Sequence, residues 1–203
     1  MDDLDESARE IGAVNTVVPE KKSNRLTGYN TDAYGFIKPL TEINDIRTAT
    51  ILGTGGASRA ASFALLKYGV EKLYLASRSA GKQAYPQKNP SIVHLIPYDN
   101  LETAIRRSQL IVNTTPVGMY PDIEKTPVPS VFLPLLEGKF CYDIIYNPVK
   151  TRFLQEAEEY GAQIIGGLDM FIHQAALSFE LWFGREMPVH MVRNVLLNLL
   201  TKP

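Results

Sequence analysis

The segment Ile51–Gly69, ILGTGGASRAASFALLKYG, has a residue pattern that suits phosphate binding. A short apolar run enters a glycine cluster, and a helical pattern leaves it. Glycines permit a tight turn and a close approach of the backbone to a pyrophosphate, and the following helix offers free N–H groups and the positive end of its dipole. Ser58, a small residue, replaces the third glycine of the usual dinucleotide fingerprint. The alternative is a glycine turn needed only for packing. We predict that the phosphates of a nucleotide contact Gly53, Thr54, Gly55, Gly56 and Ala57.

A second group of polar residues follows the next apolar run, about 20 residues beyond the glycines, where an NAD site usually carries an acid for the ribose 2′-hydroxyl. This chain has ASRSAGK there, with Ser77, Arg78, Ser79 and Lys82 and no carboxylate. A guanidinium can stack on an adenine and face a 2′-phosphate, while the hydroxyls and the lysine add donors. The segment therefore favours NADP over NAD, and the alternative is an exposed basic turn.

The elements that must position these residues are short apolar runs alternating with helical patterns from about Thr48 onward. This alternation predicts an α/β fold, with a doubly wound parallel six-stranded sheet covered by helices on both faces. The lone cysteine, Cys141, falls in one of the runs and is expected to be a core thiol. The predicted strands span residues 48–53, 71–77, 91–96, 109–114, 139–145 and 162–167.

The residues before this alternation do not belong to the predicted sheet. GAVNTVV (12–18) is typical of a strand, residues 19–28 of a polar turn, and the segment after Asn30 of a helix. We expect residues 1–45 to be a truncated N-terminal remnant of another domain with a linker helix. Residues 46–185 would form the nucleotide-binding domain, and residues 186–203 a C-terminal helix that packs back on the remnant.

Composition narrows the function class. The net charge of −1 argues against a nucleic-acid or anionic-membrane surface, which needs a basic excess. No apolar run approaches the roughly 18 residues needed to span a bilayer, and the acidic start MDDLDESARE does not look like a secretory signal. The three histidines lack metal-ligand spacing, so we expect no metal site. These features predict a soluble cytoplasmic protein.

Seven motifs together identify a family. IGAVNTVV, LTGYNTDAYGF, GTGGASRA, ASRSAGK, VNTTPVGMYP, YDIIYNP and GGLDMFIHQAALSFELW occur in this order. Together they resemble the shikimate dehydrogenase family, whose members reduce 3-dehydroshikimate to shikimate with NADPH. The resemblance extends from about Leu4 to the C-terminus. It implies a Rossmann fold, NADP as cofactor, and a place in chorismate and aromatic amino-acid biosynthesis.

The resemblance implies four substrate-binding residues: Asn15, Asp32, Tyr146 and Gln174. Asp32 would also be catalytic, as half of a lysine–aspartate pair that serves the substrate hydroxyl and proton transfer. Three of these residues have a plainer alternative. Gln174 could bond a backbone carbonyl, Asp32 could cap the helix that begins near it, and Asn15 could hold a turn.

Three further cofactor contacts are implied by position. Thr114 and Ile144 fall where the family contacts the cofactor, and Gly167 falls near the nicotinamide.

Two elements of the family's pattern are absent from these 203 residues: a serine pair for the substrate carboxylate, and a motif N-V-T-x-P-x-K whose lysine partners the aspartate. We therefore expect this polypeptide to bind NADP(H) but to be a poor dehydrogenase alone. An NADP-binding module or regulator without catalysis is the alternative function, and an enzyme preferring quinate is a variant of the first. The apolar strand at 12–18 would lose sheet neighbours and keep an unpaired apolar edge, so we also expect a homodimer.

Overall fold

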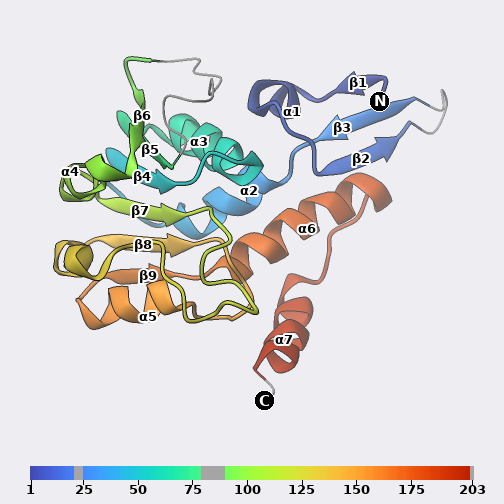
Figure 1. Cartoon of the computed structure of the whole chain (residues 1–203). Helices are drawn as coiled ribbons and strands as arrows, with labels where there is room; N and C mark the ends of the chain where they lie inside the picture. The colour runs from blue at the N-terminus through green and yellow to red at the C-terminus, as the bar shows by residue number, and fades with distance from the viewer. Residues whose placement is uncertain (21–24, 79–89, 202–203) are drawn as a thin grey trace.

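A six-stranded parallel sheet forms the core of one half of the molecule (Figure 1). The structure is a computed structural model that describes residues 1–20, 25–78 and 90–201. The spatial order is β6-β5-β4-β7-β8-β9, so the chain reverses its direction of travel across the sheet between β4 and β7 and creates a crevice at their carboxyl ends. The predicted strands are confirmed as β4 (Thr48–Leu52), β5 (Lys72–Ser77), β6 (Val93–Pro97), β7 (Leu110–Asn113), β8 (Phe140–Asp143) and β9 (Gln163–Ile165).

Alternating side chains of these strands supply two apolar layers. Ile51 and Val112 belong to a cluster with side chains of α3 and α6, whereas Leu52, Ile111 and Cys141 belong to a second cluster with side chains of α4 and α5. The four inner strands β4, β5, β7 and β8 are therefore buried on both faces, as a doubly wound fold requires. The helices that cover the sheet are α3 (Gly56–Tyr68), α4 (Leu101–Arg107), α5 (Arg152–Glu159) and the 3₁₀ helices η2 (Tyr98–Asn100) and η3 (Ser130–Leu136).

Residues near the N-terminus form a separate three-stranded sheet with a short helix on it (Figure 1). β3 lies in the middle, parallel to β1 and antiparallel to β2. The predicted strand is confirmed in part by β2, but the expected polar turn over 19–28 is wrong at its end, where β3 begins. The elements are β1 (Asp3–Leu4), α1 (Glu6–Ile11), β2 (Thr16–Pro19) and β3 (Leu26–Tyr29).

Two helices connect the small sheet to the large one. α2 (Asp32–Ile37), followed by η1 (Lys38–Leu40), packs along α6 (Gly167–Phe183). The packing is close because a Cβ on Gly35 would lie 2.5 Å from the Met170 carbonyl oxygen and 2.8 Å from the Gln174 nitrogen. At the far end of α6, Trp182 Nε1 donates to the Val17 carbonyl of β2 at 2.9 Å.

The last helix, α7 (Val189–Leu200), does not lie where we expected it. It packs against α6, with an ion pair between Arg193 and Asp169, on the side of α6 away from the small sheet (Figure 1). Gly184, at φ 65°, ends α6, and the chain turns there toward α7. The correction arises because the apolar pattern of a helix shows which face it buries but not which neighbour covers it.

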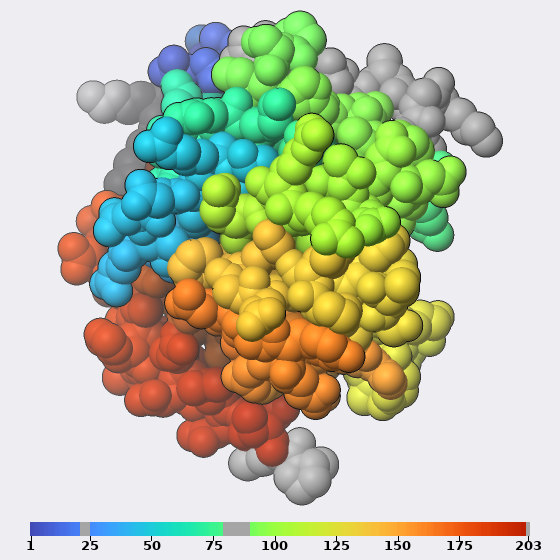
Figure 2. Space-filling model, turned by 90° about the vertical axis from the view of Figure 1, so that its left-hand side faces the viewer, coloured from blue at the N-terminus to red at the C-terminus, as the bar shows by residue number. Residues whose placement is uncertain are grey.

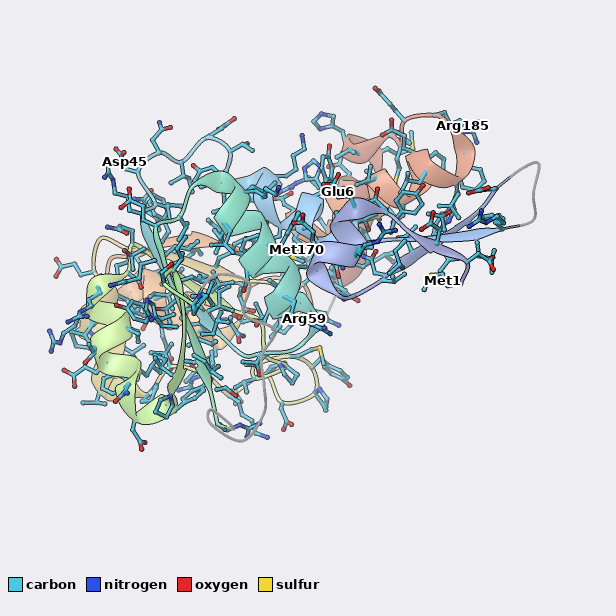
Figure 3. All side chains as sticks on the ribbon, turned by 90° about the horizontal axis from the view of Figure 1, so that it is seen from above. Met1, Glu6, Asp45, Arg59, Met170 and Arg185 are labelled. Atoms are coloured by element: carbon cyan, nitrogen blue, oxygen red, sulfur yellow. The ribbon has the colours of Figure 1, made fainter. Side chains whose placement is uncertain are left out.

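The two edges of the large sheet differ. On the side where the strands begin, the surface runs in bands of light blue and green, then yellow and orange, then red (Figure 2). The carboxyl ends face α6 and the small sheet. Arg59 of α3 donates to the Gly12 carbonyl at 2.8 Å and so joins the two regions near the middle of the molecule (Figure 3). Within the described ranges, no helix has the length and hydropathy to cross a membrane.

Candidate functional site

The glycine loop connects β4 to α3 and leaves space above the helix. Gly53 has φ 111°, which a side chain rarely adopts, and a Cβ there would meet Thr114 Oγ1 at 2.8 Å. By contrast, a Cβ on Gly55 or Gly56 would meet nothing within 4 Å. Gly55 is the N-cap of α3 and makes no side-chain capping bond, so the first N–H groups of the helix, which include that of Ala57, are available to an anion.

Ser58 replaces the third glycine of the fingerprint and has a structural use. Its side chain is buried, and its Oγ donates to the Gly53 carbonyl at 2.9 Å. This bond ties the start of α3 to the loop, so the loop is held in the shape that keeps Gly55 open.

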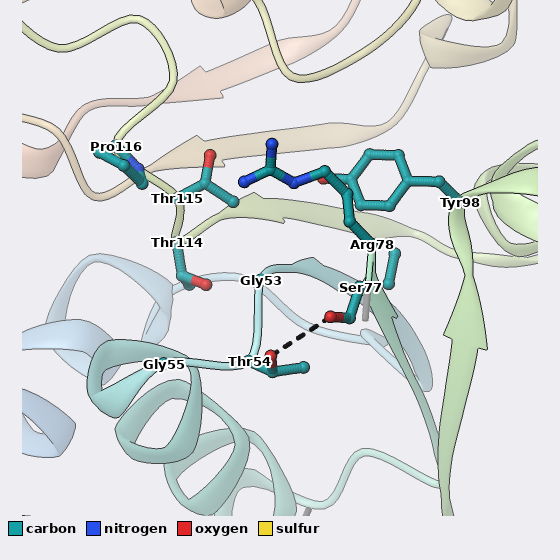
Figure 4. Close-up of a pocket in the computed structure, with 10 residues that line it drawn as sticks. Gly53, Thr54, Gly55, Ser77, Arg78, Tyr98, Thr114, Thr115 and Pro116 are labelled. Atoms are coloured by element: carbon teal, nitrogen blue, oxygen red, sulfur yellow. Dashed lines mark hydrogen bonds between the residues drawn. The ribbon is translucent and has the colours of Figure 1, made fainter. Parts of the chain in front are cut away.

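A cavity of about 430 Å³ lies beside this loop (Figure 4). Arg78 reaches across it, and the hydroxyls of Ser77 and Thr54 lie 3.4 Å apart at its base. Within the described ranges no carboxylate pairs with Arg78. Its guanidinium therefore has the charge and freedom to bind a phosphate group. Ser79 and Lys82, the other predicted residues of this turn, lie outside the described residues.

Tyr98 lines the same cavity and was not predicted. β5 and β6 pair in parallel with Ser77 opposite Pro97, so the residues that follow each strand, Arg78 and Tyr98, lie side by side. Burial raises the pKa of the Tyr98 hydroxyl, and the positive charge of Arg78 lowers it in part. The register of the two strands would have been needed to find this residue.

A second cavity, also about 430 Å³, shares the wall Thr114–Pro116 with the first. Its other side is formed by Ile144–Asn147, which follows β8, and by Met119 and Tyr120. Gly167, the first residue of α6, lies so close to Ile144 that its Cα has no room for a Cβ beside the Ile144 carbonyl. The structure thus brings the predicted residues Thr114, Ile144 and Gly167 to one edge of the sheet.

A cluster of polar groups lies between the small sheet and α6, and Asn15 and Asp32 are at its centre. Asn15 Nδ2 donates to Asp32 Oδ1 at 2.7 Å and to Thr31 Oγ1 at 3.0 Å, and Asn15 Oδ1 accepts from the Thr31 backbone N–H at 2.9 Å. The N-cap of α2 is Thr31, not Asp32. Asp32 therefore does not cap the helix, and its carboxylate is held by the Asn15 amide.

The charge of Asp32 is poorly compensated. Burial raises the pKa of this carboxyl, and the hydrogen bond from Asn15 lowers it in part. No lysine or arginine in the described part of the chain forms an ion pair with it. The raised pKa makes Asp32 a group that can take or return a proton nearer neutral pH than an exposed aspartate.

Gln174 joins this cluster from α6. Its Nε2 donates to the Phe171 carbonyl at 3.0 Å, the backbone contact that we considered as its alternative, and its Oε1 accepts from Thr31 Oγ1 at 3.3 Å. One amide proton is left without a partner among the described residues. Tyr146, the fourth predicted substrate residue, stacks on Phe171 with ring centroids 4.2 Å apart, which brings the loop after β8 next to the Gln174 turn of α6.

Three buried hydroxyls support the cluster and were missed from the sequence. Ser178 Oγ lies 2.7 Å from Thr16 Oγ1 and 3.0 Å from Thr31 Oγ1, so it bonds β2 and the start of α2 to α6. Serines and threonines are too common for their types alone to identify such a network.

A further missed residue is Asp143, at the end of β8. Its side chain is fully buried and accepts hydrogen bonds from Asn113, Thr151 and the Ile145 N–H at 2.7–3.2 Å. Burial raises the pKa of Asp143 to about 6, although these hydrogen bonds lower it in part.

The described residues contain no group of three or more histidines, cysteines and acids that could hold a metal ion.

Comparisons with known proteins agree with this geometry. Residues 167–197 match the model of the shikimate 5′-dehydrogenase C-terminal domain. The chain is 40% identical over 207 residues to the shikimate dehydrogenase (NADP(+)) of Moorella thermoacetica, an alignment that covers 97% of this chain and 68% of that protein.

Two solved structures are also similar. The shikimate 5-dehydrogenase of Thermus thermophilus, in complex with NADP(H) and shikimate, matches with a TM-score of 0.80 and 33% identity, over 98% of this chain and 72% of that one. The quinate dehydrogenase of Corynebacterium glutamicum, in complex with NAD, matches with a TM-score of 0.87 and 30% identity over the same shares.

Proposed function

Because this chain belongs to the shikimate dehydrogenase family, we propose that it is an NADP-dependent oxidoreductase that interconverts 3-dehydroshikimate and shikimate. The observation that carries the proposal is the position of two groups of residues around one crevice. The Arg78 cavity and glycine loop suit a 2′-phosphorylated dinucleotide, and the Asn15–Asp32–Gln174 cluster suits a ring bearing several hydroxyls.

The residues have distinct roles in this proposal. The first turn of α3 would bind the pyrophosphate, Arg78 the 2′-phosphate, and Thr114, Ile144 and Gly167 the remainder of the cofactor. NADPH supplies the hydride when it is bound. Asp32 would move the proton of the substrate hydroxyl, and its raised pKa supports that role.

The substrate-binding residues differ in what they can offer. The Asn15 amide donates to the Asp32 carboxylate, so Asn15 would assist substrate binding partly by orienting that carboxylate. Gln174 keeps one amide proton that no described residue accepts, which suits a hydroxyl oxygen, and Tyr146 is held beside it by Phe171.

We also propose the finer assignments. Residues 46–185 would be the cofactor domain and residues 1–45 part of the substrate domain. The protein would act in aromatic amino-acid synthesis as a cytoplasmic homodimer.

Ligand binding by this chain can be tested in successive titrations. Calorimetry should give tighter binding of NADP⁺ than of NAD⁺, followed by binding of shikimate to the NADP⁺ complex. Equal or tighter binding of NAD⁺ would overturn the cofactor assignment to Arg78. Quinate, titrated in parallel, should bind more weakly than shikimate.

A second function, NADP binding without efficient catalysis, is favoured by one observation. Asp32 has an amide and no cation as its partner within the described residues. General acid–base help from a positioned side chain, such as a lysine paired with this aspartate, is worth typically 10²–10⁴-fold in rate. We propose that this polypeptide assayed alone binds NADP⁺ and turns over slowly. A steady-state rate with shikimate and NADP⁺ at the level of the shikimate dehydrogenases that the chain resembles would refute this.

A further inference from the structure

Asp143 directly precedes Ile144 and Ile145 in the wall of the second cavity and takes no part in the roles assigned above. β7 and β8 pair in parallel with Asn113 directly opposite Asp143, so the last residues of the two strands face each other at the crevice. Both side chains are fully buried. Asn113 Nδ2 lies 3.1 and 3.2 Å from the two carboxylate oxygens of Asp143.

The Asp143 carboxylate determines the orientation of the Asn113 side-chain amide. An ionised carboxylate only accepts hydrogen bonds, so the amide nitrogen of Asn113 must face it. The amide oxygen then faces the other way, where it accepts from the Thr115 backbone N–H at 3.0 Å and from Thr115 Oγ1 at 2.7 Å. Asn113 Nδ2 also donates to the Val117 carbonyl at 3.2 Å, which closes the loop over residues 113–117.

The same carboxylate holds the opposite wall. Asp143 Oδ1 accepts from the Ile145 N–H at 3.1 Å, and Oδ2 accepts from Thr151 Oγ1 at 2.7 Å. Ile145 lies in the wall of the second cavity, and Thr151 is the N-cap of α5. One buried anion therefore contacts both loops. Thr114 lies between Asn113, which donates to Asp143, and Thr115, which donates to Asn113. Ile144 lies between Asp143 itself and Ile145, which donates to Asp143.

We propose that Asp143 is a positioning residue for the nicotinamide half of the cofactor, because it orients the Asn113 amide and so fixes the separation of the Thr114–Pro116 and Ile144–Asn147 walls. This inference rests on the proposed function. Asp143 does not line either cavity and acts through Asn113 and Ile145.

The test compares whole NADP⁺ with its adenosine half, adenosine 2′,5′-bisphosphate. The variant Asp143→Asn keeps the shape of the side chain but gives it a donor, so the Asn113 amide loses its fixed orientation. We expect NADP⁺ to bind about tenfold more weakly, equal to about 1.4 kcal/mol. The bisphosphate, which would contact the Arg78 end of the first cavity, should keep its affinity to within about twofold.

A milder variant and a control separate positioning from loss of stability. Thr151→Val removes one bond to Asp143 without altering either cavity wall, and it should weaken NADP⁺ in the same direction by a smaller factor. Ser108→Ala removes a buried hydroxyl bond to Thr50 (2.8 Å) at the amino edge of the sheet and should leave both affinities unchanged. The amide resonance of Thr115 should move in Asp143→Asn and Thr151→Val but not in Ser108→Ala.

The outcomes discriminate between the two proposals. Wild-type affinity for NADP⁺ in Asp143→Asn, or an equal loss for NADP⁺ and the bisphosphate, would overturn the positioning role and leave the proposed function standing. Failure of the wild-type chain to bind either ligand would overturn the proposed function itself.

Discussion

Individual side chains at the two sites differ in how their charges are satisfied. Arg78 has no acidic partner in the described part of the chain, Asp32 is held by a neutral amide, and Asp143 is surrounded by donors. A charge without a protein partner is suited to a ligand, whereas a fully bonded buried charge is suited to holding structure. The three predictions at this scale follow from that difference.

Arg78 should decide the choice between the two dinucleotides. In Arg78→Ala the 2′-phosphate loses a charge-assisted bond, worth typically 1.5–3 kcal/mol, so NADP⁺ should bind about 10–100-fold more weakly. NAD⁺, which has no 2′-phosphate, should be unaffected. Calorimetry with both ligands measures this, and an equal loss for both would mean that Arg78 acts on adenine instead.

Asn15 should hold the pKa of Asp32 down. Its amide bond at 2.7 Å lowers that pKa against the effect of burial, so Asn15→Ala should raise the pKa of the carboxyl further. Carboxyl carbon NMR titration of Asp32 in both proteins measures the shift directly. A pKa that is unchanged or lower in the variant would contradict the role assigned to Asn15.

Asp143 should make stability depend on pH in an unusual direction. Its pKa in the folded protein is about 6, above the ordinary aspartate value of 3.8, so the folded state holds its proton more tightly than the unfolded state. Stability from this group is therefore present below about pH 4 and is lost as the pH rises through 6, by roughly 3 kcal/mol in total.

Comparison with the uncharged variant Asp143→Asn separates the pH dependence caused by Asp143 from that caused by the other acidic residues. The free energy of unfolding of Asp143→Asn, relative to wild type, should rise steadily between pH 4 and pH 7 in urea titrations. A constant difference across this range would show that Asp143 ionises in the folded state as it does in the unfolded one.

At the scale of elements, the contact between α2 and α6 determines how the polar cluster is assembled. Gly35 allows two helix backbones to touch, and any side chain there would meet backbone atoms that cannot rotate away. Gly35→Ala should therefore lower the free energy of unfolding by about 1–3 kcal/mol. Gly56→Ala, whose Cβ would point into open space in the first turn of α3, is the matched control and should leave stability unchanged.

The elements also show what a sequence can predict. The six strands and the glycine loop were predictable because apolar runs, glycines and helical periodicity are local patterns. β3 was not, since four residues that include a glycine carry little strand signal. Tyr98 and Asp143 depend on which strands are neighbours and in what register, so Asn113 and Asp143, thirty positions apart, meet only once β7 pairs with β8.

At the scale of the whole molecule, α7 leaves an apolar stripe uncovered. Met191, Val195 and Leu199 follow one another at four-residue spacing and are 66%, 53% and 62% exposed. Contiguous apolar surface of this kind favours association. We expect sedimentation velocity to show self-association at high micromolar concentration and the double variant Met191→Lys, Leu199→Lys to reduce it. A monomer at that concentration would contradict the expected dimer.

α6 has a consequence for how the two ligands influence each other. It begins at Gly167 against the Ile144 carbonyl, carries Gln174 and Ser178 past Asp32, and is 17 residues long, or about 26 Å. A single helix that touches both sites gives a physical route by which binding at one site can change the affinity at the other. If the bound cofactor orders α6 and so raises the affinity for substrate by some factor, then bound substrate raises the affinity for the cofactor by the same factor.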